Sequence, residues 1–138
     1  MGSATRLSDR IAVYSPIISL DGKHVFFASI RRDGTVDAVT VAAETGNLEF
    51  EGSIPATTDV VDVAASWMPD NRSVAIADLR SGSPNLWSFP ALGRAMEKQL
   101  THFTSGSIFA CNYSPDGKLL ALARGSAQSD AVLFTAAK

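Results

Sequence analysis

The stretch "NYSPDGKLLALARG", residues 112–125, decides the fold, because it reads as a strand end, a tight turn and a second strand. The same pattern occurs twice more, as "IISLDGKHVFFASI" at 17–30 and as "SWMPDNRSVAIADL" at 66–79. Three copies of one hairpin in a single chain indicate a repeat protein rather than an isolated turn.

The turns of the three copies carry matching residues at matching positions. An aspartate is followed by glycine or asparagine in each copy, at Asp21-Gly22, Asp70-Asn71 and Asp116-Gly117. Glycine and asparagine tolerate the positive φ of a two-residue hairpin loop. The aspartates are 49 and 46 residues apart, which is a spacing typical of solenoids, propellers and arrays.

Large and small side chains alternate along the strand that follows each turn. The large positions are Val25, Val74 and Leu120, then Phe27, Ile76 and Leu122, and the position after them is Ala28, Ala77 and Ala123. This alternation predicts a strand with one bulky face and one mostly small face, which suits sheets stacked between two neighbours. An unrelated β-sandwich with coincidental turns does not predict these matched columns.

Each repeat also contains further predicted strands. A third strand is predicted at "DAVTVAA" from 37, "NLWSFPA" from 85 and "DAVLFTA" from 130, and a fourth at "GNLEFEGSI" and "MEKQLTHF". The first strand of the repeat is "VYSPII" at 13, "DVAASW" at 62 and "IFACNY" at 108. Small residues in its middle are typical of an innermost strand near an axis, and Trp67 and Tyr113 are expected to seal the sheets against each other. No segment shows a convincing helical period.

The composition excludes several classes of protein. At 138 residues and 46% hydrophobic, the chain is expected to form one domain with a sizeable core. A net charge of -2 gives no electrostatic case for binding nucleic acid. The single cysteine, Cys111, is expected to be a small buried hydrophobe. No signal peptide or membrane span is evident, so the chain is expected to be soluble. The sequence does not indicate its cellular compartment.

The best-matching copy points to a known family. "YSPDGKLLALARG", preceded by "NLWSFPALGRAMEKQLTHFT", resembles the TolB-like β-propeller repeat, in which an aromatic residue and Ser-Pro-Asp-Gly-Lys join the first two strands of a blade. The other copies depart from the motif as "WMPDNRS" and "ISLDGKH". The resemblance implies a scaffold for binding. It does not imply a particular reaction, because repeats of this family are found next to kinases, winged-helix regulators, prolyl-type peptidases and transport components.

The sequence contains no motif that indicates an enzyme active site. The sequence contains no Gly-x-Ser-x-Gly motif and no phosphate-binding glycine loop. His24 and His102 fall at different repeat positions, which argues against a shared metal site. The three turn aspartates are expected to accept hydrogen bonds from their own turns. We therefore predict no catalytic residue, no cofactor and no metal.

Binding residues are expected on the loops that join one repeat to the next, because these lie nearest the axis of a propeller. The candidates for ligand contact are Asp9, Arg10, Thr58, Asp59, Asp62, Thr104 and Ser105. Exposed loops are commonly polar, so the same residues are equally well explained by contact with solvent. Arg31 and Arg32 are expected on an exposed charged hairpin, with contact to an acidic partner as the alternative.

The predicted architecture is all-β, with three four-stranded antiparallel blades that form half of a six-bladed propeller. The repeats span about 10–54, 55–103 and 104–138. Residues 4–9 supply a strand that completes a terminal blade of a second copy, so that two chains close one ring as a homodimer. A truncated piece of a longer propeller is the main competing interpretation.

Three functions follow from this architecture. The leading hypothesis is a non-enzymatic scaffold that binds a protein, peptide or small ligand at its axial loops. A regulatory or gating propeller fragment of a larger enzyme or kinase is the alternative, and a purely architectural unit is the third. No nucleic-acid or membrane partner is expected.

Overall fold

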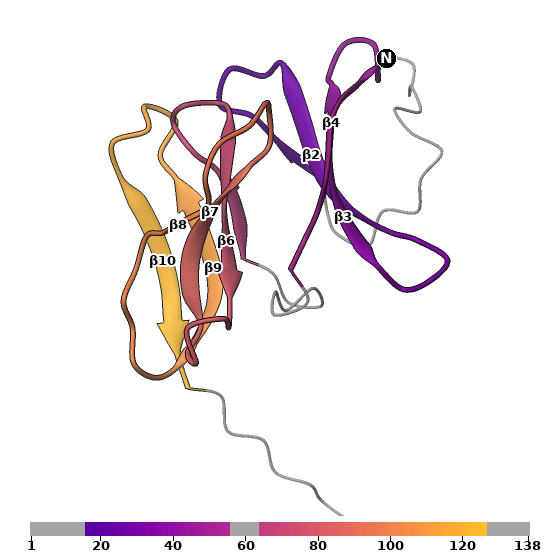
Figure 1. The fold of residues 1–138 in the computed structure, drawn as a ribbon. Helices are drawn as coiled ribbons and strands as arrows, with labels where there is room; N and C mark the ends of the chain where they lie inside the picture. The colour runs from indigo at the N-terminus through magenta and orange to yellow at the C-terminus, as the bar shows by residue number, and fades with distance from the viewer. Residues whose placement is uncertain (1–15, 56–63, 127–138) are drawn as a thin grey trace, which may run out of the picture.

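The computed structural model describes residues 16–55 and 64–126, and these form antiparallel β-sheets (Figure 1). The first sheet contains β1 (Ile17–Ile18), β2 (His24–Ile30), β3 (Val36–Ala42) and β4 (Leu48–Ser53). The second contains β5 (Ala65–Trp67), β6 (Ser73–Asp78), β7 (Asn85–Pro90) and β8 (Lys98–Gln99), and the third pairs β9 (Ser107–Tyr113) with β10 (Leu120–Gly125). Strands that are neighbours in sequence are neighbours in each sheet. The all-β expectation is confirmed.

The strand registers follow the alternation seen in the sequence. In the first sheet Phe27 pairs with Val39 and Ala28 with Ala38. Phe27 and Val39 therefore point to one face, and the two alanines point to the other, here called the small face, which also carries Phe26. The described residues contain no helix, and hence none that is long and apolar enough to cross a membrane. The third strand predicted from residue 130 and the strand predicted at 4–9 lie outside the described residues.

The first and second sheets pack through a small face against a bulky face. Val74 and Ile76 of β6 lie in one buried cluster with Phe26, Ala28 and Ala38 of the first sheet. Trp67 is 2% exposed at this interface, and its ring is 6.4 Å from that of Phe26 in an edge-on arrangement. The predicted position of Trp67 between sheets is confirmed.

The second and third sheets repeat this arrangement. Ala77 and Leu86 of the second sheet form a buried cluster with Ile108 and Cys111 of β9. Leu120 and Leu122 of β10 pack against the same cluster. Burial raises the pKa of the Cys111 thiol to about 11, which fits the expected role as a buried apolar side chain.

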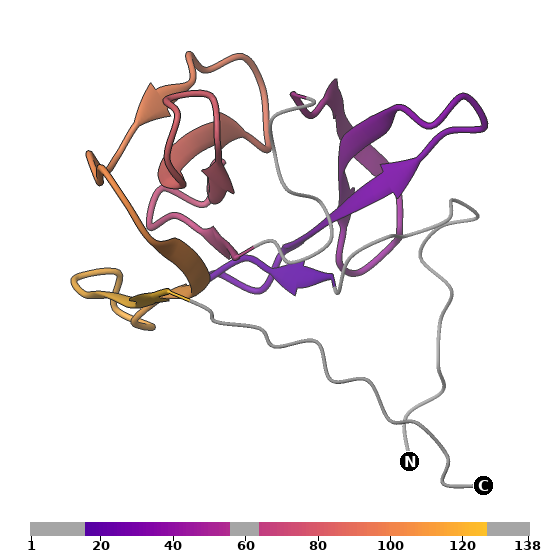
Figure 2. The same ribbon diagram turned by 90° about the horizontal axis from the view of Figure 1, so that it is seen from below.

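The first strands of the three repeats lie beside one another. β5 contacts both β1 and β9, the Trp67 indole N–H donates to the Ile17 carbonyl at 3.0 Å, and the Tyr113 backbone N–H donates to Ser66 Oγ at 3.2 Å. Figure 2 shows the three sheets fanning out from this line of first strands. The first strand of each repeat is therefore its innermost strand among the described residues.

The two ends of the array differ in exposure. On the far side of the first sheet, Phe27, Val39 and Val41 form a separate buried cluster. On the far side of the third sheet, Ala121 and Ala123 are exposed, and Phe109 is 51% exposed. The small face of the third sheet is thus accessible, whereas the small faces of the first two sheets are covered.

Candidate functional site

The hairpin turn between the first two strands of a repeat is built by a serine and an aspartate. Ser19 Oγ donates to Asp21 Oδ1 at 2.6 Å, and the Lys23 backbone N–H donates to the same oxygen at 3.1 Å. Ser19 Oγ also accepts the His24 N–H at 2.9 Å. The serine hydroxyl therefore links the carboxylate to the start of the next strand.

The third copy of the turn is built in the same way. Ser114 Oγ donates to Asp116 Oδ1 at 2.6 Å and accepts the Leu119 N–H at 3.0 Å. These hydrogen bonds, with the serine hydroxyl first, hold the pKa of Asp116 below its usual value, and the corresponding bonds do the same for Asp21. Both carboxylates therefore stay ionised under ordinary conditions.

The second copy dispenses with the serine. Met68 stands at that position, and Asp70 Oδ1 accepts the backbone N–H groups of Arg72 and Ser73 directly, each at 2.9 Å. The expectation that all three aspartates serve their own turns is confirmed. Among residues 16–55 and 64–126 no group of three metal-ligating side chains occurs.

The predicted backbone geometry of the turns is also observed. Gly22 and Gly117 have φ of 73° and 70°, and Asn71, at the same repeat position, has φ of 51°. Asn71 Oδ1 accepts the Asp21 N–H of the neighbouring turn at 3.2 Å. A glycine could adopt this φ but could not form this hydrogen bond. Asparagine therefore shapes one turn and ties it to another.

The third turn sits directly on the second. A Cβ added at Gly117 would lie 2.7 Å from the Cβ of Pro69. The close approach requires a residue without a side chain at this position. Together with the Asn71 contact, it brings the three turns to one place at the same end of the three sheets.

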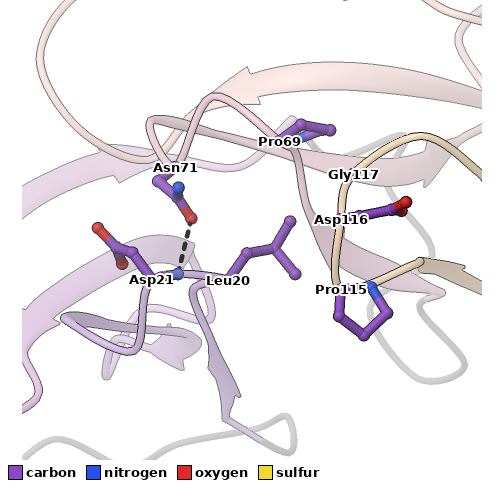
Figure 3. A pocket seen from close by; sticks show the side chains of 7 residues that line it. All are labelled: Leu20, Asp21, Pro69, Asn71, Pro115, Asp116 and Gly117. Atoms are coloured by element: carbon purple, nitrogen blue, oxygen red, sulfur yellow. Dashed lines mark hydrogen bonds between the residues drawn. The ribbon is translucent and has the colours of Figure 1, made fainter.

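The three turns line an open pocket of about 200 Å³, here called the turn pocket. It is lined by Leu20, Asp21, Pro69, Asn71, Pro115, Asp116 and Gly117. Figure 3 shows Leu20 pointing between the two prolines, whereas the carboxylates of Asp21 and Asp116 point outward on opposite sides. The pocket offers apolar walls, one amide and flanking negative charge. Such a site suits the binding of a side chain.

Sequence analysis did not predict the turn pocket. The repeat alignment placed the three turns at equivalent positions, but it did not show that they meet. The signal was present, because equivalent turns of consecutive blades lie at the same end of a propeller axis. The departure of the second copy from Asp-Gly to Asp70-Asn71 was a further signal.

The predicted axial-loop candidates are placed only in part. Asp9, Arg10, Thr58, Asp59 and Asp62 lie outside the described residues. Thr104 and Ser105 are exposed between β8 and β9. Because strands alternate in direction within a sheet, this connection lies at the end opposite the turn pocket.

The loop that carries Thr104 and Ser105 is held by an arginine. The Arg124 guanidinium donates to the Ser105 carbonyl and lies 3.9 Å from the centre of the Phe103 ring. Stacking of this kind fixes the orientation of the guanidinium. The loop is therefore attached to β10 and presents Thr104 outward.

Sequence analysis also missed two clusters of one arginine with two acids. Arg31 pairs with Asp37, whose side chain is fully buried, and lies 3.7 Å from Glu51 on β4. Arg80 pairs with buried Asp78 at 2.9 Å and with Glu97, and it stacks on Trp87 at 4.5 Å. The Asp37 contact holds the pKa of Arg31 above its usual value. Arg31 thus ties its hairpin to β4, and its side chain is half exposed.

The remaining polar candidates stay apart. His24 Nδ1 lies 2.7 Å from Glu49 Oε2, whereas His102 is exposed on the connection after β8. Arg32 is exposed, as expected for a charged hairpin. The two histidines are not brought into a common site.

Part of the chain is similar in sequence to known proteins. No family model matches the chain. It is 32% identical over 95 residues to "Tol-Pal system protein TolB" of Anaeromyxobacter sp. (strain K), which is 68% of this chain and 20% of that protein. TolB of Anaeromyxobacter dehalogenans (strain 2CP-C) is 30% identical over the same length. The chain thus spans about one fifth of the length of these curated relatives.

Solved structures agree on the fold. The crystal structure of TolB from Acinetobacter baumannii superposes with a TM-score of 0.60 at 23% identity, over 88% of this chain and 28% of that one. A chain from an analysis of two prolyl endopeptidases gives a TM-score of 0.58 at 18% identity, over 81% of this chain and 18% of that one. At these identities the likeness concerns the fold alone. Together with the curated relatives, it confirms the resemblance of these repeats to the TolB-like β-propeller repeat family.

Proposed function

We propose that this chain is a non-enzymatic β-propeller module that binds a protein, peptide or small ligand through loops at its axis. One observation carries the proposal: β1, β5 and β9 lie side by side, so the first residues of these three strands gather at one end of the array. A rigid scaffold that gathers loops from several repeats is a typical binding surface. The relatives' name, Tol-Pal system protein, favours a protein partner.

The proposed ligand surface contains the residues expected from the sequence. It combines exposed Thr104 and Ser105 with Asp9, Arg10, Thr58, Asp59 and Asp62 of the connections outside the described residues. The proposed repeats span about 10–54, 55–103 and 104–138. The relatives are named as Tol-Pal system proteins rather than as kinases or peptidases, so the regulatory enzyme fragment is not favoured.

We further propose that the chain supplies three blades and that two copies close a six-bladed ring. The accessible small face of the third sheet supports this assembly, because the equivalent alanines of the second sheet are covered by a neighbouring sheet. Residues 4–9 of each copy would complete the last blade of the other. In a longer polypeptide, additional blades would cover the same face instead.

Sedimentation equilibrium of the full chain tests the assembly. The expected mass is twice the chain mass of 14.6 kDa, and deletion of residues 1–9 is expected to give a monomer. A monomeric full chain at micromolar concentration, or a deletion variant that remains dimeric, would contradict the proposed ring.

Site-specific crosslinking tests the axial-loop surface. A photoreactive amino acid replaces Thr104 in the chain expressed in its native cell, and Glu44, exposed on the turn between β3 and β4 at the opposite end, serves as the matched control. A discrete adduct from position 104 alone is expected. Equal crosslinking from both positions, or none from position 104, would contradict the proposal.

A further inference from the structure

The turn pocket has apolar walls that are available to a ligand. Leu20 is 37% exposed, and Pro69 and Pro115 are exposed on either side of the space into which it points (Figure 3). Proline rings and a leucine side chain offer flat hydrocarbon surfaces, which pack well against an aromatic ring. A volume of about 200 Å³ accommodates one large side chain but not a drug-sized ligand, whose pockets span roughly 300–1,000 Å³.

The pocket also contains a hydrogen-bond donor for a peptide backbone. Asn71 uses Oδ1 to accept the Asp21 N–H, and this contact fixes the orientation of the amide. Nδ2 has no hydrogen-bond partner among the described residues. It can donate to a backbone carbonyl of a chain that lies across the pocket.

The charged side chains that line the pocket are both negative. Asp21 has no cation within ion-pair distance among the described residues, and Asp116 has only exposed Lys118, whose Nζ is 3.9 Å away. An exposed pair of this kind contributes little. A ligand with positive charges on both sides of an apolar group therefore complements the two ends of the pocket.

We propose that the turn pocket binds a tryptophan or phenylalanine side chain that a partner protein presents next to lysine or arginine. This inference rests on the proposed function only in treating the chain as a protein-binding module, because the pocket lies at the end opposite Thr104. The aromatic ring packs between Pro69, Pro115 and Leu20. The cationic neighbours face Asp21 and Asp116, and Asn71 binds the intervening backbone.

A blocked pentapeptide of sequence Gly-Lys-Trp-Lys-Gly tests the inference. It is titrated into the full chain labelled with ¹⁵N, and amide shifts are followed at Leu20, Asn71 and Gly117. A single anchor side chain is expected to give saturable shifts with a Kd on the order of 1 mM. Peptides with alanine in place of tryptophan, or with glutamates in place of the lysines, are expected to give no saturable shifts.

Two leucine variants test whether the peptide binds in the turn pocket or on the surface beside it. Leu20→Ser removes one apolar wall and is expected to weaken binding of the tryptophan peptide about tenfold. Leu119→Ser is the matched control, because Leu119 is 71% exposed beside the third turn but does not line the pocket. The control is expected to bind within about twofold of the original chain. Should Leu20→Ser unfold, Asn71→Gly keeps the positive φ and removes the amide.

The outcomes either support or overturn the inference. Shifts that are confined to the three turns, and that need about tenfold more peptide with Leu20→Ser or are weakened by Asn71→Gly, support it. Equal shifts with the glutamate peptide, shifts unaffected by these substitutions, or no saturable shifts overturn it. Crosslinking at Thr104 reports on the opposite end. Its failure together with pocket binding rejects the axial-loop surface alone, and the reverse result rejects the turn pocket alone.

Discussion

β6 and β10 occupy the same repeat position and carry the same alternation of large residues and alanines, yet their environments differ. All six residues of β6 are buried, whereas those of β10 are exposed or half-buried. Ala75 is fully buried and its counterpart Ala121 is exposed. The sequence pattern therefore encodes a strand suited to lie between two sheets. Position in the array decides whether both neighbours are present.

The largest expected difference between these strands comes from a charge on the small face. Ala75→Glu places a carboxylate at a position that is fully buried between two sheets, and we expect a loss of more than about 5 kcal/mol of unfolding free energy. Ala121→Glu is expected to leave the fold intact and to abolish self-association, because its side chain enters solvent in a single chain. Urea denaturation and sedimentation measure the two effects. Equal destabilisation would show that the third sheet is covered within one chain.

A second difference concerns the aromatic residues that end β5 and β9. Trp67 is buried between sheets and donates to the Ile17 carbonyl, so Trp67→Ala is expected to cost about 3–5 kcal/mol. Tyr113 is half-buried, and Tyr113→Ala is expected to cost about half as much or less. Thermal unfolding of both variants measures the difference. An unchanged melting temperature for Trp67→Ala would contradict its position in the core.

A third comparison sets the first turn against the third. Gly22→Ala introduces strain from positive φ alone, because nothing lies near the added Cβ, and a cost of about 1 kcal/mol is expected. Gly117→Ala adds a clash with Pro69, and a further cost of about 1–3 kcal/mol is expected. Chemical denaturation of the two variants provides the test. Identical costs would show that the third turn does not press on the second.

The parts of the fold that depend on local chemistry were predictable from the sequence. The Asp-Gly and Asp-Asn turns, the alternating strands and the buried Trp67 follow from hairpin geometry and side-chain size, and each is observed. The family resemblance rested on the same local motif. Local rules suffice for these features, because each is determined within a few residues or within one strand.

The turn pocket and the arginine clusters depend on contacts that local rules do not supply. Asn71 and Asp21 are 50 positions apart, and their contact depends on the angle between sheets. The bond from Arg31 to Asp37 spans one hairpin, so strand register could have indicated it. The second acid of each cluster lies on or next to the fourth strand, and its approach depends on sheet twist.

The smallest effect expected is an acid dependence of stability at the two turns that contain a serine. Hydrogen bonds, first of all from Ser19 and Ser114, hold the pKa values of Asp21 and Asp116 below the ordinary 3.8. A lowered pKa in the folded state means that the ionised carboxylate stabilises the fold. This stabilisation is complete above the pKa of the unfolded chain and is lost as the pH falls through the folded value.

Removing one hydroxyl is expected to affect one carboxylate only. Ser19→Ala removes the largest cause of the lowered pKa of Asp21, so the titration of this carboxyl should move toward 3.8, while Asp116 stays unchanged. Ser114→Ala should do the reverse, which makes each variant the control for the other. Carboxyl ¹³C shifts followed from neutral pH into acid give the two pKa values separately. If Ser19→Ala left the titration of Asp21 unmoved, the backbone N–H of Lys23, rather than the serine, would be the group that stabilises the ionised turn.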